Sequence, residues 1–236
     1  MMVEKTSEID PGKNIVMIVY SRGGVGKTTF AASSPNTLIF DFENGTKFLG
    51  NRGIDVNVVR MNSWFKASEK PELANLINGY DSIVIDPLGE AMDKLIDSTE
   101  INGKKYRTGD GSPTMAGWGE IKKQMRNFIK WLRGTGKNVI IVAHENESQT
   151  DEGLTHRIQV ATKLSEEIPN MVDVISYMAI RKADGKMQRV LYTPQQGGSF
   201  DSKDRLGRIP EVVEISELNG WNDFLESMTV KEEGDK

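Results

Sequence analysis

Residues 14–29 read Asn14-Ile-Val-Met-Ile-Val-Tyr-Ser-Arg-Gly-Gly-Val-Gly-Lys-Thr-Thr29, an apolar run followed by a glycine-rich segment and a Gly-Lys-Thr triplet. The run is rich in β-branched residues and has no polar alternation, which predicts a strand buried on both faces of a parallel sheet. A short helix is expected over 27–33, because Pro35 follows closely and stops it. This order of strand, glycine-rich turn and helix is the setting that a phosphate-binding P-loop requires.

The glycine-rich turn offers the groups that a nucleoside triphosphate needs. Glycines let backbone N–H groups face phosphate oxygens, and the start of the following helix adds unpaired N–H groups and a positive dipole end. Lys27 is expected to reach the β- and γ-phosphates, and the Thr28 hydroxyl to bind Mg²⁺. The usual first glycine of the motif is Ser21 here, and a glycine turn without a ligand is the alternative interpretation. The expected nucleotide-binding residues are Arg22, Gly23, Gly24, Val25, Gly26, Lys27, Thr28 and Thr29.

Acidic residues end two later apolar strands. The strand expected at 82–86 ends in Asp86, which we predict to hold Mg²⁺ together with Thr28. Asp41 and Glu43 end the strand that follows the P-loop helix, and their alternate positions place them on the same side. We interpret Glu43 as the carboxylate that orients and deprotonates an attacking water. The alternative is a solvated strand end followed by a turn.

His144 follows the apolar run at 138–143. Because ligands of parallel sheets bind at the carboxyl ends of the strands, the polar residues at these ends are expected to meet in one crevice. There His144 is predicted to sense the γ-phosphate by hydrogen bonding; a polar residue that merely caps a strand is the alternative. The expected catalytic residues are Lys27, Glu43 and His144.

The remaining chain alternates apolar strands with helical segments, which predicts an α/β sheet with helices on both faces. Two late strands joined by a turn predict an antiparallel hairpin at one sheet edge. We expect one domain at 13–228, between a polar tail at 1–12 and a charged tail at 229–236. Further strands are predicted at 55–61, 172–180 and 187–193, helices at 70–78, 88–101, 118–133 and 217–228, and a long loop at 102–117.

Composition excludes several classes of protein. The 236 residues contain no cysteine, so disulfides and thiolate metal sites are impossible. A net charge of −4 excludes a uniformly basic nucleic-acid binder, although a local basic patch is still compatible with it. The apolar runs are too short to cross a bilayer. We therefore expect a cytoplasmic protein with no membrane association.

These motifs together resemble the RecA-like AAA-type ATP-binding proteins that are common in bacteriophages, some of which act in single-strand annealing and recombination. The resemblance spans roughly residues 13–210 and rests on 26–46, Val84-Ile85-Asp86, 136–145 and Lys203-Asp204-Arg205. It implies a RecA-type core, ATP and Mg²⁺ as ligands, and slow hydrolysis at Glu43 that DNA or oligomerisation stimulates.

The resemblance also implies assembly into a ring or filament, in which ATP lies between subunits and a basic residue of the neighbour completes the site. Lys203 and Arg205 match the position of such trans-acting fingers, with a solvated basic turn as the alternative. The P-loop is also similar to that of ParA/MinD-type partitioning ATPases. There the residue at position 22 would be lysine, and the helix broken here by Pro35 is too short for that family.

Lys104, Lys105, Tyr106 and Arg107 combine three cations with one aromatic ring in the long loop. Such a group grips phosphates and stacks a base, so these residues are candidates for binding single-stranded DNA; a solvated loop is the alternative. The resemblance favours single-stranded DNA as partner, with a single-strand-binding or other recombination protein as a further one. The competing function is a nucleotide-gated protein-interaction module or a ParA/MinD-like ATPase without an annealing role.

Overall fold

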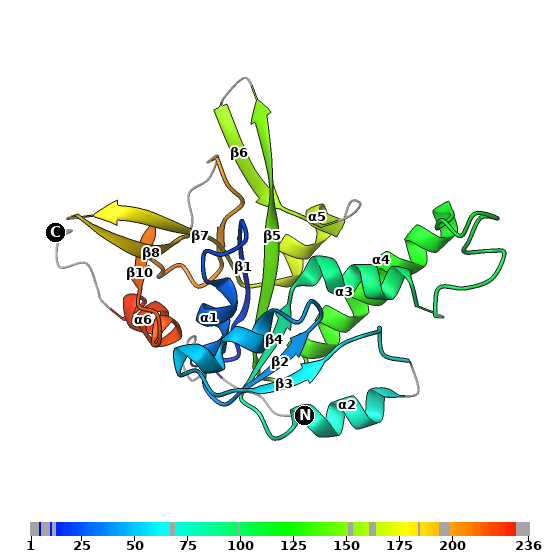
Figure 1. The fold of residues 1–236 in the computed structure, drawn as a ribbon, viewed down its shortest axis with the longest axis horizontal. Helices are drawn as coiled ribbons and strands as arrows, with labels where there is room; N and C mark the ends of the chain where they lie inside the picture. The colour runs from blue at the N-terminus through cyan, green and yellow to red at the C-terminus, as the bar shows by residue number, and fades with distance from the viewer. Residues whose placement is uncertain are drawn as a thin grey trace.

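The computed structural model describes Lys5, Asp10 and residues 13–66, 69–98, 100–150, 153–160, 164–183, 185–193 and 199–229. The tails expected at 1–12 and 229–236 lie almost entirely outside these residues, so the domain boundaries stay a prediction. Figure 1 shows the described chain as a ribbon.

Strands and helices alternate along the chain as predicted. The first half contains β1 (Val16–Ser21), α1 (Lys27–Ala32), β2 (Thr37–Asp41), η2 (Gly45–Phe48), η3 (Gly50–Arg52), β3 (Asn57–Arg60), α2 (Lys70–Ile77), β4 (Ser82–Asp86), α3 (Leu88–Ile96) and α4 (Met115–Arg133), where η marks a 3₁₀ helix. The second half contains β5 (Asn138–Thr150), β6 (Gly153–Ile158), α5 (Leu164–Glu167), η5 (Ile168–Met171), β7 (Val174–Ala183), β8 (Lys186–Tyr192), β9 (Lys203–Asp204), β10 (Val212–Ile215) and α6 (Gly220–Ser227). The two-residue β9 and the short β10 were not predicted, because neither is long enough to show a periodic pattern.

One mixed sheet organises the described residues, in the order β10-β8-β7-β1-β5-β4-β2-β3 (Figure 1). The strands from β7 to β3 run parallel, whereas β8 and β10 are antiparallel additions at one edge. The predicted fold class, a mainly parallel α/β core with a late antiparallel hairpin, is therefore confirmed. β5 lies between β1 and β4, so the P-loop strand and the strand that ends in Asp86 are not direct neighbours.

Helices cover both faces of this sheet. Alternate residues of β1 point to opposite faces, and every residue of the strand is buried, as its apolar run predicts. One face packs Val16, Ile18 and Tyr20 beneath α2, α3, α4 and α5. The other face packs Met17 and Val19 against α1 and α6. Because both faces of β1 are fixed in this way, the loop that follows it has a defined starting point.

The longest helix, α4, has 19 residues and buries the stripe that its spacing predicts. Ile121, Met125, Ile129 and Leu132 face the core, while basic residues occupy the other sides. Within the described chain, no helix has both the length and the apolar character that crossing a bilayer demands.

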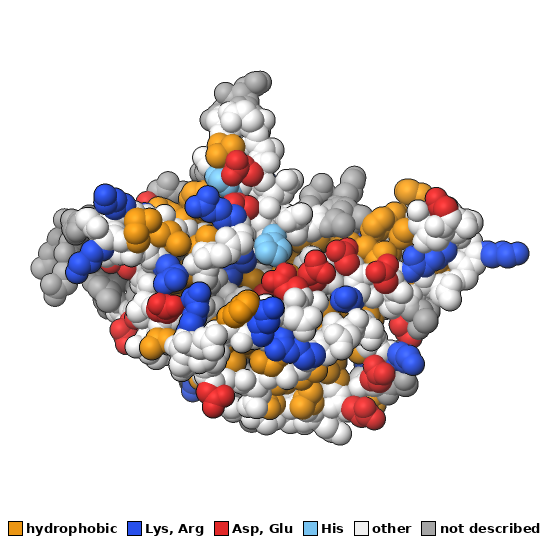
Figure 2. All heavy atoms as spheres, viewed as in Figure 1, with side chains coloured by type: hydrophobic (Ala, Val, Ile, Leu, Met, Phe, Trp, Pro, Cys, Tyr) orange, Lys and Arg blue, Asp and Glu red, His pale blue; other side chains and the backbone are white. Residues whose placement is uncertain are grey.

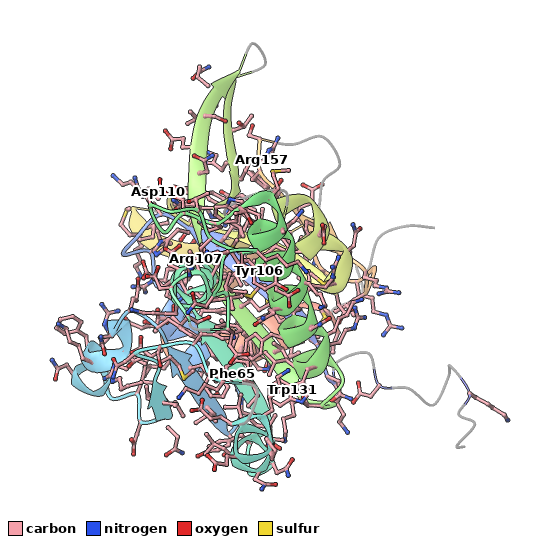
Figure 3. The ribbon with its side chains drawn as sticks, turned by 90° about the vertical axis from the view of Figure 1, so that its right-hand side faces the viewer. Phe65, Tyr106, Arg107, Asp110, Trp131 and Arg157 are labelled. Carbon is pink, nitrogen blue, oxygen red and sulfur yellow. The ribbon has the colours of Figure 1, made fainter. Side chains whose placement is uncertain are left out.

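The loop between α3 and α4 differs from the prediction at both ends. α3 ends at Ile96 rather than at residue 101, and α4 begins at Met115, because the Thr114 side chain caps it by accepting a hydrogen bond from the Gly117 N–H at 3.1 Å. Between them, the Arg107 guanidinium donates to the carbonyls of Ile96, Ile101 and Gly111 (Figure 3). The loop predicted at 102–117 therefore ends at the Thr114 cap and is organised around a single arginine.

Replacement of Gly117 at the start of α4 is expected to destabilise the protein. A Cβ added there would lie 2.2 Å from the Tyr106 carbonyl oxygen, whereas one added at the exposed Gly119 meets nothing within 4 Å. Gly117→Ala should lower the free energy of unfolding by about 1–3 kcal/mol through overpacking. Gly119→Ala should raise it by up to about 1 kcal/mol, since alanine is the better helix former. Urea denaturation of the two variants measures the contrast, and equal stabilities would contradict the described packing of this loop.

Candidate functional site

The P-loop joins β1 to α1 at the carboxyl edge of the parallel strands. Gly24 and Gly26 have φ values of 80° and 114°, a backbone region that side chains rarely tolerate. A Cβ added at Gly24 would meet nothing within 4 Å, so the loop is open to solvent at that position. A Cβ added at Gly26 would lie 2.8 Å from the Arg189 Nε, so that side of the loop is closely covered.

Lys27 lies at the centre of this loop. Its ammonium donates to the carbonyl oxygens of Ser21 and Arg22, both at 2.9 Å, and to the Ser21 hydroxyl at 3.2 Å. Ser21, where the usual motif has glycine, thus supplies an extra acceptor for the lysine. Burial lowers the pKa of Lys27, while the nearby carboxylates of Asp86 and Glu43 act in the opposite direction.

Thr28 and Asp86 meet as predicted. The Thr28 hydroxyl, from the first turn of α1, donates to Asp86 Oδ2 at 2.7 Å. Asp86 is almost completely buried, and this burial raises its pKa to about 6, with the charges of Glu43 and Asp41 acting in the same direction. A hydroxyl and a carboxylate side by side are oxygen ligands of the kind that Mg²⁺ takes beside phosphates, so these residues fit the predicted metal role.

Asp41 builds the turn that presents Glu43. Its buried carboxylate accepts hydrogen bonds from the N–H groups of Glu43, Gly45 and Thr46 at 3.1–3.2 Å, and it pairs with Arg60 from β3. The Asp41 carboxylate therefore stabilises the turn through these hydrogen bonds. Glu43, by contrast, keeps 37% of its side chain exposed and faces the cavity above the P-loop.

His144 lies inside a strand rather than at a strand end, which corrects the sequence interpretation. β5 continues to Thr150, and His144 is in register with Ser21 of β1, directly beside the P-loop. Its Nε2 lies 3.6 Å from Glu43 Oε2. The histidine of β5 and the glutamate of the turn after β2 thus approach each other across the cavity.

Lys27, Thr28, Glu43, Asp86 and His144 line one cavity of about 290 Å³. Figure 2 shows acidic side chains and a histidine gathered near the middle of this face of the molecule. Of the predicted nucleotide-binding residues, Val25 turns into the core and Arg22 is exposed beside the loop, and neither borders the cavity. The predicted residues that do line it are Gly23, Gly24, Gly26, Lys27, Thr28, Thr29, Glu43, Asp86 and His144.

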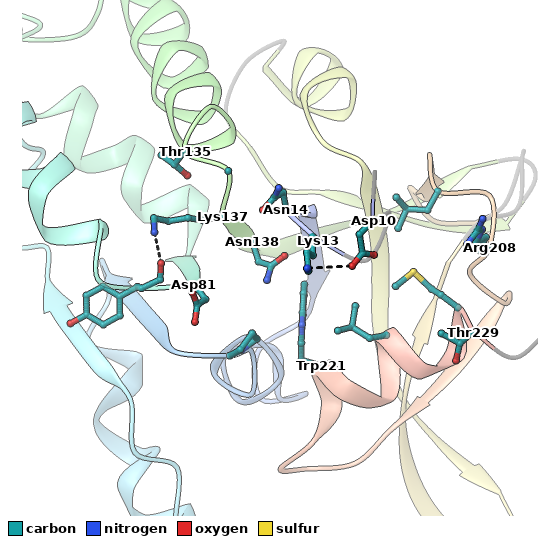
Figure 4. Close-up of a pocket in the computed structure, with 16 residues that line it drawn as sticks. Asp10, Lys13, Asn14, Asp81, Thr135, Lys137, Asn138, Arg208, Trp221 and Thr229 are labelled. Carbon is teal, nitrogen blue, oxygen red and sulfur yellow. Dashed lines mark hydrogen bonds and ion pairs between the residues drawn. The ribbon is translucent and has the colours of Figure 1, made fainter. Parts of the chain in front are cut away.

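A larger cavity, of about 640 Å³, lies at the opposite end of the sheet (Figure 4). It is lined by residues next to the amino ends of β1 and β5, including Asn14 and Asn138, together with Trp221 of α6. None of the predicted site residues lines it. Size alone therefore does not identify the functional site, whereas the convergence of charged groups at the P-loop does.

Two arginines at the edge of the P-loop were missed from the sequence. Arg189 of β8 donates from Nε to the Val25 carbonyl at 3.0 Å, and its guanidinium lies 3.8 Å from Glu217. The same Glu217 accepts from Arg52, which lines the cavity, at 3.1 Å. No local motif marks Arg189, because only the pairing of β8 with β7 brings it to the loop, and Arg52 lies in η3, outside any recognisable motif.

Lys203 and Arg205 are not brought to this cavity. They lie at the amino-terminal end of β7, where β9 pairs with Val174 and Ile175. The Lys203 ammonium donates to the carbonyls of Pro169 and Val172 at 2.6 and 2.7 Å. Their role as trans-acting fingers needs a second subunit and stays a prediction.

The four DNA-binding candidates separate into two pairs. Lys104 and Lys105 are exposed, and the Lys105 ammonium lies 5.2 Å from the centre of the Tyr106 ring. Tyr106 packs against the core, and Arg107 is held by loop carbonyls. Only the two lysines therefore present exposed charges to a ligand.

Comparison with known proteins places these features in context. Residues 13–206 match a family model described as "AAA domain". The structure is similar to a KaiC-like protein from the archaeon Pyrococcus horikoshii OT3, with 11% identity, 88% coverage of both chains and a TM-score of 0.47. It is also similar to the flagellar accessory protein FlaH from Methanocaldococcus jannaschii, with 8% identity, coverage of 86% and 85%, and a TM-score of 0.48. Among curated proteins there is no match.

Mg²⁺-dependent nucleotide binding is expected to weaken as the pH falls through about 6. Because the pKa of Asp86 is raised to about 6, this carboxyl is protonated below that pH and no longer offers a metal ligand. Calorimetric titration with an ATP analogue and Mg²⁺, from mildly alkaline to mildly acidic pH, measures the effect. Asp86→Asn is the control, since any pH dependence that this variant shares comes from the nucleotide itself. An identical pH profile for both proteins would contradict the role of Asp86.

Proposed function

Because this chain belongs to the AAA domain family, we propose that it binds ATP with Mg²⁺ in the P-loop cavity and hydrolyses the γ-phosphate slowly. The observation that supports this most directly is the contact of the Thr28 hydroxyl with Asp86 at 2.7 Å, beside the buried ammonium of Lys27. Hydroxyl, carboxylate and ammonium come from α1 and β4, two elements whose packing sets their spacing. The competing explanation, a glycine turn without a ligand, does not account for a buried acid and a buried lysine side by side.

Binding rests on the loop and its lysine. The N–H groups of the P-loop and the start of α1 face phosphate oxygens, and Lys27 moves from the carbonyls of Ser21 and Arg22 to the β- and γ-phosphates. Mg²⁺, held by Thr28 and Asp86, supplies positive charge to the phosphates when it is bound. The resemblance to phage ATP-binding proteins favours ATP over other nucleotides.

Hydrolysis is assigned to Glu43. Its carboxylate accepts a proton from the water that attacks the γ-phosphorus, while the bond to the β-phosphate oxygen breaks and ADP leaves. The turn that Asp41 holds keeps Glu43 at the cavity edge, and His144 at 3.6 Å orients this carboxylate or senses the γ-phosphate. His144 lies on β5 and Glu43 in the turn after β2, so movement of either element changes their distance.

The positions of Lys203 and Arg205 are compatible with the head-to-tail assembly that we propose. They lie at the amino end of the sheet, whereas the P-loop lies at the carboxyl end, so they serve as fingers only for a neighbouring copy. Such a head-to-tail contact is heterologous, and it produces a ring when the rotation closes and a filament when it does not. We propose this arrangement for the active form.

Single-stranded DNA is the partner that we propose, in recombination, annealing or replication of the phage type. Lys104 and Lys105 support it as two adjacent exposed cations on a loop that Arg107 stiffens. Lys123 and Lys130 of α4 are also exposed, and Lys123 pairs with Glu120 at 3.3 Å. The competing function, a nucleotide-gated module that contacts another protein, needs the same P-loop but no DNA.

Glu43→Gln is expected to bind ATP with unchanged affinity and to hydrolyse it about 100-fold or more slowly, because a general base is removed. Lys27→Ala should instead lose binding. Glu72→Gln, an exposed glutamate on α2, is the matched control and should behave as the original protein. Phosphate release measures hydrolysis and calorimetry measures affinity. Full hydrolysis by Glu43→Gln would move the base elsewhere, and full affinity of Lys27→Ala would refute the P-loop assignment.

A double variant, Lys104→Glu with Lys105→Glu, is expected to bind single strands more weakly. The slope of log affinity against log salt concentration should become shallower by about 1.4, because each lost phosphate contact contributes about 0.7. Lys182→Glu with Lys186→Glu, at the exposed tip of β7–β8, makes the same charge change far from the loop and serves as control. Fluorescence anisotropy of a labelled oligonucleotide measures both. Absence of binding by the original protein at low salt, with or without ATP, would favour the interaction module.

A further inference from the structure

Two glutamates and one histidine converge on the hairpin formed by β5 and β6. Glu145 and Glu147 lie two residues apart on β5 and so face the same side. His156 of β6 is in register with Glu147, which places its ring on that side too. His156 Nδ1 lies 2.9 Å from Glu145 Oε2 and 3.8 Å from Glu147 Oε2, and one ligand atom from each residue lies within 4.8 Å of the others.

The geometry points to a binding site for a divalent transition-metal ion, such as Zn²⁺, formed by Glu145, Glu147 and His156. Imidazole nitrogen suits ions of this class, whereas Mg²⁺ and Ca²⁺ prefer ligand sets made of oxygen alone. The Glu147 side chain is 54% exposed, so water can fill the remaining coordination positions. The side chains of Glu145 and His156 are only 7% and 17% exposed, which limits their freedom before an ion binds.

Neighbouring residues hold these side chains in place, as the surroundings of metal sites generally do. The His156 ring lies 5.0 Å from the Tyr177 ring at an angle of 30°. The Tyr177 hydroxyl lies close to Glu145. The His156 backbone is fixed as well, because its carbonyl accepts hydrogen bonds from the Tyr20 hydroxyl and the Asp201 N–H, both at 3.2 Å.

This site is separate from the P-loop cavity, although it is close to it. His144 and Glu145 are consecutive residues of β5, so their side chains leave the strand on opposite faces. His144 lines the P-loop cavity with Glu43, whereas Glu145 faces Tyr177. An ion at this site would join β5 to β6 at the base of the hairpin that projects from the sheet (Figure 1).

Composition makes the test specific. The chain has no cysteine and two histidines, so strong Zn²⁺ binding has few alternative sources. The full-length, metal-stripped protein would be titrated with Zn²⁺ by calorimetry, in millimolar Mg²⁺ and without nucleotide. We expect one ion per chain, loss of binding in Glu147→Gln and His156→Gln, and about 10–100-fold weaker binding in Tyr177→Phe. Co²⁺, monitored by its visible absorption, provides a second reading of the same site.

Two controls locate the ion. Ser148→Ala, on the opposite face of the same strand, and His144→Gln, in the P-loop cavity, should both bind as the original protein does. Glu147 is exposed, so Glu147→Gln decides the outcome if His156→Gln does not fold. Absence of saturable binding, binding that survives Glu147→Gln, or binding lost in His144→Gln would each overturn the proposal. None of these outcomes depends on ATP, so they leave the proposed function untouched.

Discussion

The double burial of β1 is the constraint on which the rest of the structure depends. Its residues hydrogen-bond to β5 on one edge and β7 on the other, and both of its faces are packed beneath helices. A strand held on four sides cannot slip in register, because a shift of one residue would exchange its two apolar faces. The P-loop begins at the last residue of this strand, so the packing of the core determines the position of Lys27. The same pairing with β5 sets His144 beside Ser21.

Buried charge distinguishes the P-loop cavity from the other hollows of the molecule. Asp41, Asp86 and Lys27 are all nearly inaccessible to water, yet they play different parts. Asp41 is satisfied by backbone N–H groups and Arg60, so its charge stabilises a turn. Asp86 has a single hydroxyl partner and a raised pKa, which is the condition of an acid that gains from an added cation. Hydrogen-bond partners, rather than burial alone, separate the acid that holds a turn from the acid that we propose as a metal ligand.

The sequence predicts well the strands and site residues that follow from a local pattern of residues. It predicts poorly the contacts that depend on the pairing of strands far apart in the chain. β1, β4 and the first half of β5 are continuous apolar runs, so both the fold class and the polar residues at their ends could be located in advance. Arg189 and Glu217 could not, because they reach the P-loop only through the antiparallel edge of the sheet. The start of α4 was placed too late, because glycines in its first turns read as loop while the Thr114 cap outweighs them. The apolar run ends before His144, so the sequence predicts a strand end there, with a loop or a hairpin over 145–157; the structure has the hairpin, and β5 continues through His144.

The second half of β5 connects the P-loop cavity to the hairpin formed with β6. The strand is continuous from Asn138 to Thr150, so the element that borders the P-loop cavity through His144 extends on the order of 20 Å beyond it, into the hairpin. A contact with the described part of the hairpin, at Ser148 or Leu154 for example, therefore acts on the same pair of strands that carries His144 toward Glu43.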